Sequence, residues 1–590
     1  MELDFVHARK TAFEYLSKTN SLFVLTLSQQ RELSLSSFAE VWNVKAEFFL
    51  PEKSIKEITL HVCLPNEFPL VLPKIYLAPS DNKWIQYIPH VDTKGYICTL
   101  DDEFVSLDAD QPGAIVKIIL DKALTILEDG LAKKNVADFA EEFIAYWEEK
   151  YGKKDEVHCG MSIIEHNFLP PANTIKFLHL SQSYAGYSII IHHESPEFLQ
   201  LKKYLKERKF SFDELESFYL GELNSLLPPF NATNTSILDI IQTHFPDLST
   251  RFGNFINTNS YPKVVLFSTI QSERRMYFGW RIHRLNTNRN GFRPTTLSPI
   301  NVMDSFQKND PADRIKFDQF TSERLIERSE GIASLNTKLK IGIAGLGSIG
   351  SNLIPYLLPL GIEKLLLVDP DILTLENTPR HLLGVDAIPQ YKTDAIKIFL
   401  EDSNPFINIT AIRKSIVNVV INDPTSINEC DYLFVAIGKT TIEEYLSNAL
   451  KENKICKPLF ILWVEPFLIG AHCIFIQPGH NISFKGLFLD GFFKYNIISE
   501  AEYKDPLREF TFKEAGCQST YVPYGMKSIV LFLSALIPEI YSLIENKSTQ
   551  NLHISWRGPG LLLKDMNIKL SEFGNQIKEN TIAINDLEWK

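Results

Sequence analysis

The sequence predicts an α/β protein built from several domains. At 590 residues, the chain is longer than a single hydrophobic core usually supports. Around residue 340, an apolar strand leads into a glycine-rich turn, a helix and a second apolar strand, which is typical of a nucleotide-binding α/β domain. The first 150 residues instead run through a helix, a strand meander and closing helices, which indicates a separate α+β domain.

The glycine-rich turn is the clearest motif in the chain. Lys340 to Ala344 is a predicted strand, and Gly345, Gly347 and Gly350 then give the pattern GxGxxG. In such a turn the first glycine permits a tight bend, the second lets the backbone approach phosphate or ribose, and the third lets the helix pack close to the sheet. The helix N-terminus also offers unpaired N–H groups to an anion.

The elements after the turn strengthen this prediction, because GxGxxG alone is a weak signal. Ser351 to Leu360 has a helical pattern, and Leu365 to Val368 is a second apolar strand. Asp369 ends that strand, where an acidic residue can meet the ribose hydroxyls of a nucleotide. We therefore expect a nucleotide site here, although these residues do not specify the nucleotide.

The charged and amide side chains that follow the second strand indicate the kind of chemistry. They are Asp369, Asp371, Asn377, Arg380 and Lys392. In this order they resemble the ThiF/MoeB/ubiquitin-activating superfamily, whose members adenylate the C-terminal carboxylate of a protein. Such an enzyme needs cations to hold a triphosphate and to stabilise charge on the departing pyrophosphate, whereas a dehydrogenase has no use for them. The alternative is a solvated loop of mixed charge.

This resemblance implies ATP and Mg²⁺ as cofactors. Arg380 and Lys392 would hold phosphates, Asp369 would hold the ribose, and Asn377 would help to position the nucleotide.

The ligand for the metal is an open question in this sequence. The family usually has a Mg²⁺-binding aspartate at the end of the next apolar strand, here predicted at Cys430 to Ile437. This chain has Gly438 and Lys439 at that place. Glu443 or Asp371 could supply a carboxylate oxygen instead, and the sequence does not decide between them. His472 and Cys473 are flanked by apolar residues and are predicted as core residues, not metal ligands.

A second functional residue is predicted near the C-terminus. Cys517 lies in the polar segment from Glu509 to Gly525, just before a long apolar helix predicted at Met526 to Ile544. A cysteine on a flexible loop, C-terminal to the adenylation site, resembles the thioester cysteine of activating enzymes. Such a loop must carry its thiol to the acyl-adenylate. The alternative is an ordinary loop cysteine.

The same family commonly forms dimers in which an arginine reaches into the neighbouring site. Arg324 and Arg328 lie on a charged helical stretch just before the nucleotide-binding strand. Arg324 is the candidate for this role, and a solvated helix face is the alternative. By resemblance we expect a homodimer through the adenylation domain.

The first domain resembles a ubiquitin-conjugating domain. Its predicted elements are helices at Leu3–Ser17, Gly113–Lys133 and Val136–Lys150, and antiparallel strands at Val41–Leu50 and Ile55–Leu64. A Phe68-Pro69 turn and the loop Gly95-Tyr96-Ile97-Cys98 carry the resemblance, which makes Cys98 the thioester-bearing cysteine. A nucleophilic thiol must be partly ionised and exposed, as a loop allows. The alternative is a buried, inert cysteine.

One motif departs from that family. Conjugating enzymes usually have His-Pro-Asn, whose asparagine steadies the oxyanion, whereas this chain has His90-Val91-Asp92. Either Asp92 has taken over part of the role, or another donor supplies it. For His90, bracing the loop is the alternative to a catalytic role.

These observations place three domains along the chain. They are a ubiquitin-conjugating-like α+β domain at 1–155, an α/β connecting domain at 156–318 and a Rossmann-like ThiF/ubiquitin-activating adenylation domain at 319–590. The connecting domain carries no motif that indicates its function. It is predicted to contain strands at Thr174–Leu180, Tyr187–His192, Lys263–Thr269 and Arg275–His283, a helix at Pro196–Lys209 and a loop at Asn231–Ser236.

Bulk properties restrict the classes of partner and compartment. The net charge of −12 argues against non-specific nucleic-acid binding. No signal peptide and no apolar run long enough to cross a membrane is evident. Seven scattered cysteines, without a CxxC pair, suit a reducing cytoplasm and free thiols and argue against a structural zinc site.

Together, the two cysteine sites and the ATP site resemble the bifunctional conjugating and activating enzymes of bacterial CBASS antiphage systems. That resemblance implies acyl-adenylate formation, thioesters on Cys517 and then Cys98, and ligation to a target lysine. The modifier would be the C-terminus of a cGAS-like nucleotidyltransferase (CD-NTase). A sulfur-carrier activating enzyme and a non-catalytic nucleotide-binding scaffold are the alternatives.

Overall fold

The computed structural model divides the chain into two compact units. The first unit contains Met1–Glu194 and Phe210–Phe320, and the second contains Ser195–Lys209 and Thr321–Lys590. The structure describes all residues except 1–3, 50–53, 86, 101–104, 152–154, 172–173, 272, 290–294, 326–338, 482, 507, 509, 511, 514–519, 522, 561–562, 564–566 and 588–590. The first unit holds two separate large sheets, and the second holds one. The three domain boundaries predicted from the sequence stay a prediction.

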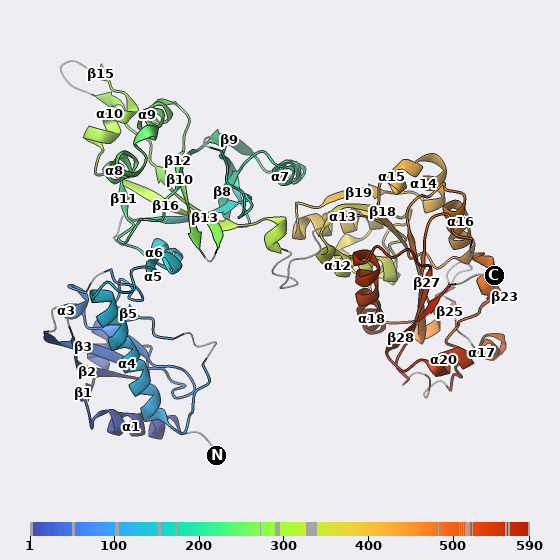
Figure 1. Ribbon diagram of the computed structural model, residues 1–590, viewed down its shortest axis with the longest axis horizontal. Coiled ribbons are helices and arrows are strands. Elements are labelled where there is room, and N and C mark those ends of the chain that lie inside the picture. Colours follow the sequence, from blue (N-terminus) through green and yellow to red (C-terminus); the bar gives the residue numbers. More distant parts are fainter. Residues whose placement is uncertain are drawn as a thin grey trace. The chain divides into compact units, whose positions relative to one another are not determined.

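An antiparallel sheet forms the N-terminal part of the first unit. Its strands, in spatial as well as sequence order, are β1 (Ser21–Val24), β2 (Glu40–Phe49), β3 (Ile55–Leu64), β4 (Lys74–Leu77) and β5 (Tyr96–Ile97). The helices around it are α1 (Phe5–Leu16), α2 (Leu27–Glu32), α3 (Pro79–Asn82) and α4 (Pro112–Leu131). In Figure 1, α4 lies across the strands, and its apolar face, including Val116 and Leu120, is buried against them. The predicted first helix, strand pair and α4 are confirmed.

The strands of the middle sheet come from both sides of Ser195–Lys209, the segment that belongs to the second unit. Its order is β10-β12-β13-β16-β6-β8-β7-β9, with β11 pairing to β16. The strands are β6 (Val157–Ser162), β7 (Lys176–Tyr184), β8 (Tyr187–His192), β9 (Phe212–Glu216), β10 (Phe218–Glu222), β11 (Ala232–Thr233), β12 (Lys263–Gln271), β13 (Arg274–Ile282) and β16 (Pro311–Gln319). The four predicted strands of the connecting domain are confirmed as β7, β8, β12 and β13.

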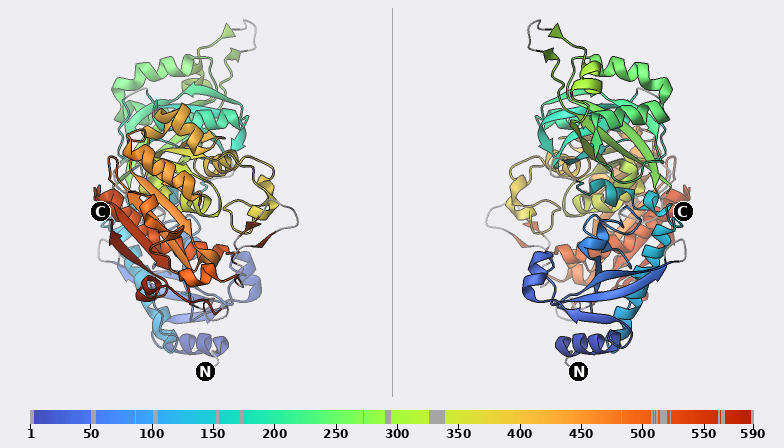
Figure 2. Two further views of the ribbon diagram at one scale, coloured as in Figure 1. Left: turned by 90° about the vertical axis from the view of Figure 1, so that its right-hand side faces the viewer. Right: turned by 90° about the vertical axis from the view of Figure 1, so that its left-hand side faces the viewer.

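Helices and a hairpin complete the middle region. They are α8 (Asn234–His244), α9 (Ser249–Asn257), α10 (Pro299–Asn301) and the hairpin of β14 (Asn288–Arg289) and β15 (Thr295–Thr296), which projects from the domain (Figure 2). The prediction of a loop at Asn231–Ser236 is wrong, because β11 and the start of α8 occupy this segment. Thr233 caps α8 through its side chain, which accepts a hydrogen bond from the backbone N–H of Ser236, so the helix begins within that segment.

Two short helices replace the single helix predicted at Val136–Lys150. They are α5 (Asp138–Glu141) and α6 (Phe143–Glu148), separated at Glu142, whose ψ of 9° is not helical. Both helices contribute buried aromatic side chains to the core of the middle sheet, Phe139 from α5 and Phe143 and Trp147 from α6. Residues placed in the first domain by sequence therefore pack against the middle sheet.

The second unit is built on a doubly wound sheet. Five parallel strands lie in the order β19-β18-β17-β20-β21, followed by antiparallel β22, β27 and β28. Their bounds are β17 (Leu339–Ala344), β18 (Ile362–Val368), β19 (Asn408–Ile412), β20 (Tyr432–Val435), β21 (Leu459–Val464), β22 (Gly470–Ile476), β27 (Leu552–Arg557) and β28 (Thr581–Asp586). The strands predicted at Lys340–Ala344, Leu365–Val368 and Cys430–Ile437 are confirmed as β17, β18 and β20.

Helices cover both faces of this sheet. One face carries α12 (Ser348–Leu357), α13 (Lys392–Ser403) and α18 (Met526–Glu545), and the other carries α14 (Ile416–Asn422), α15 (Pro424–Asn428) and α16 (Thr440–Lys451). Smaller elements are α17 (Glu500–Lys504), α20 (Glu572–Gln576) and the strand pairs β23 (Phe488–Leu489) with β24 (Phe492–Phe493) and β25 (Phe512–Lys513) with β26 (Thr520–Tyr521). This arrangement sends α12 and α16 to opposite faces.

Two helices of the second unit, α18 and α7 (Pro196–Glu207), have positions that their sequences alone do not reveal. The long apolar helix predicted near the C-terminus is confirmed as α18, but it is longer than the sequence analysis allowed, because by length and composition it could cross a membrane. Its apolar side, including Ile529 and Ile544, is buried in the core of the second unit. α7 lies between β8 and β9 in the sequence but packs within the second unit. There Tyr204 and Arg208 contact the Asp402 carboxylate of α13 at 3.0 and 2.7 Å.

Candidate functional site

The strand order of the second unit creates a crevice between β17 and β20. The chain leaves β17 into α12 on one face and leaves β20 into α16 on the other, so the two loops diverge at the carboxyl end of the sheet. Such a switch point is the usual ligand site of doubly wound sheets. A cavity of about 390 Å³ lies there. Its lining comprises Gly347, Ser348, Ile349, Arg380, Ala436, Ile437, Gly438, Thr440, Glu443, Leu462, Trp463, Val464, Glu465, Pro466, Phe488 and Tyr524.

The three glycines of the turn meet different constraints. Gly345 has φ +87°, and a Cβ there would lie 2.6 Å from the Ala436 carbonyl oxygen. A Cβ on Gly350 would lie 1.9 Å from the Gly345 carbonyl oxygen, so α12 starts in direct backbone contact with the turn. A Cβ on Gly347 would meet no atom of the described residues within 4 Å, and this glycine lines the cavity. The first and third glycines therefore serve packing, and the second leaves space open to a ligand.

Asp369 is tied to the same turn. Its buried carboxylate accepts hydrogen bonds from the backbone N–H groups of Leu346, at 2.6 Å, and Asp371, at 2.8 Å. Burial raises the pKa of this carboxyl, against the lowering effect of these bonds. Asp371 forms an ion pair of 3.0 Å with Lys392, the first residue of α13. Asp369, Asp371 and Lys392 thus form one cluster beside the turn, outside the cavity lining.

The remaining predicted nucleotide residues separate into two environments. Arg380 lines the cavity, and its guanidinium lies 5.1 Å from the ring centre of Tyr524, whose hydroxyl is 2.6 Å from Ser348 Oγ. Asn377 instead accepts hydrogen bonds from the backbone and hydroxyl of Thr374, at 3.1 and 3.3 Å. The structure therefore brings Gly347 and Arg380 to the cavity and gives Asn377 a local capping contact.

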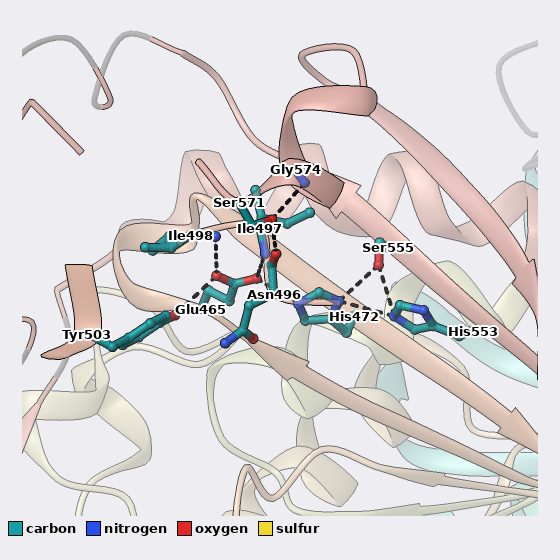
Figure 3. A network of polar contacts seen from close by, with 10 residues as sticks. All are labelled: Glu465, His472, Asn496, Ile497, Ile498, Tyr503, His553, Ser555, Ser571 and Gly574. Carbon is teal, nitrogen blue, oxygen red and sulfur yellow. Dashed lines mark hydrogen bonds and ion pairs between the residues drawn. The ribbon is translucent and has the colours of Figure 1, made fainter. Parts of the chain in front are cut away.

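Two glutamates face the cavity, and they differ in their hydrogen bonding. Glu465 is 3% exposed, and its oxygens accept from the backbone N–H groups of Ile497 and Ile498, at 2.5 and 2.8 Å, and from the Tyr503 hydroxyl, at 3.1 Å (Figure 3). Its Oε1 also lies 2.8 Å from His472 Nε2. Both carboxylate oxygens of Glu465 are therefore bonded to other groups of the protein.

Glu443 is equally buried but only partly bonded. It is 3% exposed, and one carboxylate oxygen, Oε1, has no hydrogen-bond partner among the residues that the structure describes. Burial raises the pKa of this carboxyl to about 7, while backbone N–H groups of Gly438 and Lys439 act in the opposite direction. A buried acceptor without a partner is costly unless a ligand or cation completes it. Between the two metal-ligand candidates, Asp371 is exposed and paired with Lys392, so Glu443 fits a cation better.

The sequence did not indicate which residues would complete the cavity. Ser348, Trp463, Glu465 and Tyr524 line it without belonging to the glycine motif. Glu465 directly follows the apolar strand β21, and an acidic residue at the carboxyl end of a parallel strand is the feature of the sequence that could have indicated it. His472 and Cys473 are each 0% exposed, which confirms their prediction as core residues.

Cys98 lies on the surface of the first unit. It is exposed and comes directly after β5, and its backbone N–H donates to the His90 carbonyl at 2.8 Å. Asp92, at the place of the usual asparagine, accepts from the N–H groups of Lys94 and Tyr96 at 2.9 and 2.7 Å. Asp92 therefore holds the loop as an acceptor, and an ionised carboxylate cannot donate to an oxyanion.

The side chain of His90 lies between two carboxylates. Its Nδ1 lies 2.6 Å from Glu142 Oε1, and its Nε2 lies 3.1 Å from Asp138 Oδ2. The hydrogen bond to Glu142 is the main cause that raises the pKa of His90, against the effect of burial. Burial alone would raise the pKa of Glu142, but the bonds with His90 lower it. These contacts assign a bracing role to His90.

The other predicted site residues are only partly placed. Cys517 lies outside the described residues, in 514–519, between the paired strands β25 and β26. Glu509 and Arg328 also lie outside them. Arg324 is in a short helical segment, where its backbone N–H donates to Thr321 Oγ1 at 3.2 Å.

A further group of possible metal ligands occurs in the middle sheet. Glu156, His158 and Asp313 bring one ligand atom each within 4.8 Å of one another. Arg281 already donates to Asp313 Oδ2 at 2.6 Å and lies 3.2 Å from His158 Nε2. A cation would meet this guanidinium, so the group is a poor metal site.

Two segments of the chain match known protein families. Residues 29–155 match the prokaryotic E2 family B. Residues 323–473 match the ThiF family. The chain therefore joins an E2-like domain to a ThiF domain, as the sequence predicted.

Individual relatives cover less of the molecule. The molybdopterin-synthase adenylyltransferase of Haemophilus influenzae is 40% identical over 75 residues, which are 12% of this chain and 31% of that protein. The crystal structure of PaaA is 15% identical with a TM-score of 0.28 and covers 40% of this chain and 64% of its own. E. coli MccB with ATP is 19% identical with a TM-score of 0.26 and covers 40% and 62%. The chain thus spans under a third of the first relative and under two thirds of these structures, whose TM-scores carry no functional argument.

The contact between His90 and Glu142 predicts a pH-dependent contribution to stability. Because the pKa of His90 is raised, its protonated ring stabilises the folded state. This contribution is fully present below pH 6.5, the ordinary pKa of histidine, and is lost as the pH rises through the raised pKa. The lowered pKa of Glu142 gives stability that is present above its ordinary value of 4.5 and lost as pH falls through the lowered value. Glu142→Gln should therefore lower the melting temperature most between these two ordinary values, and less at alkaline pH.

Thermal melts of the full chain across this pH range would measure the effect. The control is Glu141→Gln, which removes the neighbouring exposed carboxylate. A melting-temperature difference for Glu142→Gln that is independent of pH, or equal to that of Glu141→Gln, would refute the contact.

Proposed function

We propose that this protein activates the C-terminal carboxylate of a partner protein with ATP and passes the acyl group through two of its own cysteines to a lysine. One observation above all supports this proposal. A single chain contains an E2-like domain with an exposed cysteine and a ThiF domain with a ligand-sized cavity at its glycine turn.

The first step would take place in the cavity of the ThiF domain. A carboxylate oxygen of the partner attacks the α-phosphorus of ATP, and pyrophosphate leaves, so that a mixed acyl-adenylate remains. The N–H groups at the start of α12 and the guanidinium of Arg380 would hold the phosphates. Lys392, which is paired with Asp371, lies beside the turn and would act on the same nucleotide. Asp369 would fix the turn and meet the ribose.

Two thioesters would then carry the acyl group. The Cys517 thiolate attacks the carbonyl carbon of the acyl-adenylate and releases AMP. The Cys98 thiolate attacks that thioester and restores the Cys517 thiolate. A lysine amine of the target finally attacks the carbonyl carbon of the Cys98 thioester, loses a proton and forms an amide, and the Cys98 thiol leaves. The two thioesters retain the activation that ATP supplied, and formation of the amide consumes it.

A divalent cation fits this site through Glu443. The unpartnered, buried Oε1 of this residue is an oxygen ligand of the kind that Mg²⁺ prefers, on the lining that also contains Gly347 and Arg380. When bound, Mg²⁺ would neutralise charge on the triphosphate and on the departing pyrophosphate. Glu443 replaces, in this proposal, the aspartate that the family usually carries at the end of the strand.

The partner and setting are further parts of the proposal. By the order of its motifs, the chain would act in a CBASS antiphage system, with the C-terminus of a CD-NTase as the modifier and lysines of cellular proteins as targets. It would work in the cytoplasm as a homodimer through the adenylation domain, with Arg324 reaching the neighbouring site. No nucleic acid or membrane is needed for these steps.

Non-reducing gels would test the cysteine relay. With ATP, Mg²⁺ and a CD-NTase whose C-terminus is free, Cys517→Ala should abolish both thioesters, because the acyl group reaches Cys98 only through Cys517. Cys98→Ala should leave a thiol-sensitive adduct on Cys517. Cys456→Ala is the control, since Cys456 is another exposed cysteine and should not matter.

Two other results would indicate different functions. An adduct confined to Cys517 in the unmutated chain would favour a sulfur-carrier activating enzyme, which has no use for the E2-like domain. ATP binding without any adduct would favour a nucleotide-binding scaffold.

The role of Glu443 predicts a loss of metal-dependent nucleotide binding. Glu443→Gln keeps the size of the side chain but removes its charge, so the increase in ATP affinity caused by Mg²⁺ should fall by roughly tenfold or more. Calorimetric titration of ATP with and without Mg²⁺ would measure this increase. Glu444→Gln is the matched control on the same helix. An unchanged Mg²⁺ effect in Glu443→Gln would show that Glu443 only caps the loop before α16.

A further inference from the structure

Helices α5 and α6 are part of the core of the middle sheet. The ring of Phe143 lies 4.8 Å from that of Phe278 on β13, and the Trp147 ring lies 5.4 Å from it. The Trp147 indole N–H also donates to the Ile315 carbonyl of β16 at 3.2 Å. The buried Arg314 on β16 donates to the Trp147 carbonyl and pairs with Asp155 at 2.6 Å. These aromatic and polar contacts fix α6 to the middle sheet. α5 joins the same core through Phe139, whose ring lies 5.3 Å from that of Tyr146 on α6.

The same two helices present carboxylates to the loop that precedes Cys98. Glu142 contacts the His90 ring with Oε1, at 2.6 Å, and accepts the His90 backbone N–H with Oε2, at 3.0 Å. Asp138 contacts the other ring nitrogen at 3.1 Å. The loop is thus held through both the side chain and the backbone of one residue.

Two more contacts continue this attachment along the loop. The Tyr146 hydroxyl donates to the Ile88 carbonyl at 3.2 Å. Glu149, just after α6, accepts the Thr93 backbone N–H with both carboxylate oxygens at 3.2 Å. The segment 88–93 therefore takes most of its non-local polar contacts, among the residues that the structure describes, from α5, α6 and Glu149.

The geometry of His90 links these contacts to Cys98. His90 has φ +65°, in the left-handed region that non-glycine residues seldom adopt without support from their surroundings. Its carbonyl accepts the Cys98 backbone N–H at 2.8 Å. A shift of His90 out of this conformation would remove the acceptor that positions the backbone of Cys98.

We propose that the connecting domain sets the conformation of the Cys98 loop through α5 and α6, with Glu142 and Asp138 as positioning residues that act through His90. This gives the connecting domain a function in acyl transfer: the middle sheet holds the loop in the form that accepts and passes on the acyl group. A partner that shifts the middle sheet would therefore alter transfer at Cys98. The effect on acyl transfer rests on the proposed function, whereas the link from the middle sheet through α5 and α6 to the Cys98 loop does not.

Hydrogen exchange of the full chain tests the link without requiring any activity. Phe278→Leu changes the packing beneath α6, far along the chain from Cys98. Phe177→Leu is the matched control, because Phe177 is also fully buried in this sheet but belongs to the core on its opposite face. Exchange in peptides covering 88–98 should accelerate about tenfold in Phe278→Leu and in Glu142→Ala, and should stay unchanged in Phe177→Leu.

Single-turnover transfer provides the second readout. In Glu142→Ala, the adduct on Cys517 should form at the normal rate, while transfer to Cys98 should slow about tenfold.

Unchanged exchange in Phe278→Leu, with circular dichroism showing a folded chain, would overturn the link, as would equal acceleration in both phenylalanine variants. If Phe278→Leu fails to fold, Glu142→Ala decides by the same exchange measurement. Faster exchange with unchanged transfer would leave α5 and α6 as a structural brace only and would overturn the functional part. If the unmutated chain forms no adduct at all, the proposed function fails, and the exchange result stands alone.

Discussion

Close backbone packing at the turn after β17 is the constraint on which the adenylation domain depends. With no side chain at Gly350, the first turn of α12 rests against the Gly345 carbonyl, and Gly345 in turn rests against Ala436 after β20. The two diverging loops of the switch point are thereby fixed to each other. Asp369 extends this attachment to β18 through the Leu346 N–H. The resulting cavity is lined by this turn, by Arg380, by aromatic side chains such as Trp463 and Tyr524, and by the carboxylates of Glu443 and Glu465.

The buried carboxylates show how hydrogen bonding can separate a structural residue from a ligand-binding one. Glu465 and Glu443 have the same exposure and line the same cavity. Within the described part of the chain, however, Glu465 makes four polar contacts, whereas Glu443 retains an oxygen without a partner. An unpaired buried oxygen is destabilising in the free protein, so its retention is understandable if a cation completes it. The free-energy cost of burial would then be offset when the nucleotide and metal bind.

The features of the fold and the site that depend on local sequence could be predicted, and those that depend on distant parts of the chain could not. The glycine turn was predictable because its demands are local: a positive φ at Gly345 and the absence of a Cβ at Gly350. The strands were predictable from apolar runs, and the exposure of Cys98 was predictable from the glycine-containing loop that leads to it. The hydrogen-bond partners of Asp369 were not, because the amide of Leu346 becomes its neighbour only when β17 and β18 pair. A helical pattern likewise identified an apolar face around Phe143 and Trp147 but not the sheet that covers it. Asp92 illustrates a third case, since motif similarity suggested a role that its acceptor contacts do not support.

In the proposed mechanism, a protein terminus is activated at the cavity between β17 and β20 before either cysteine is involved. Exchange of labelled pyrophosphate into ATP tests that claim most directly, because it requires formation and reversal of the acyl-adenylate and no thiol. With the unmutated chain, Mg²⁺ and a CD-NTase, exchange should occur when the CD-NTase tail ends in a free carboxylate and should vanish when the tail is amidated. Exchange that is equal with both tails, or absent with both, would contradict the account.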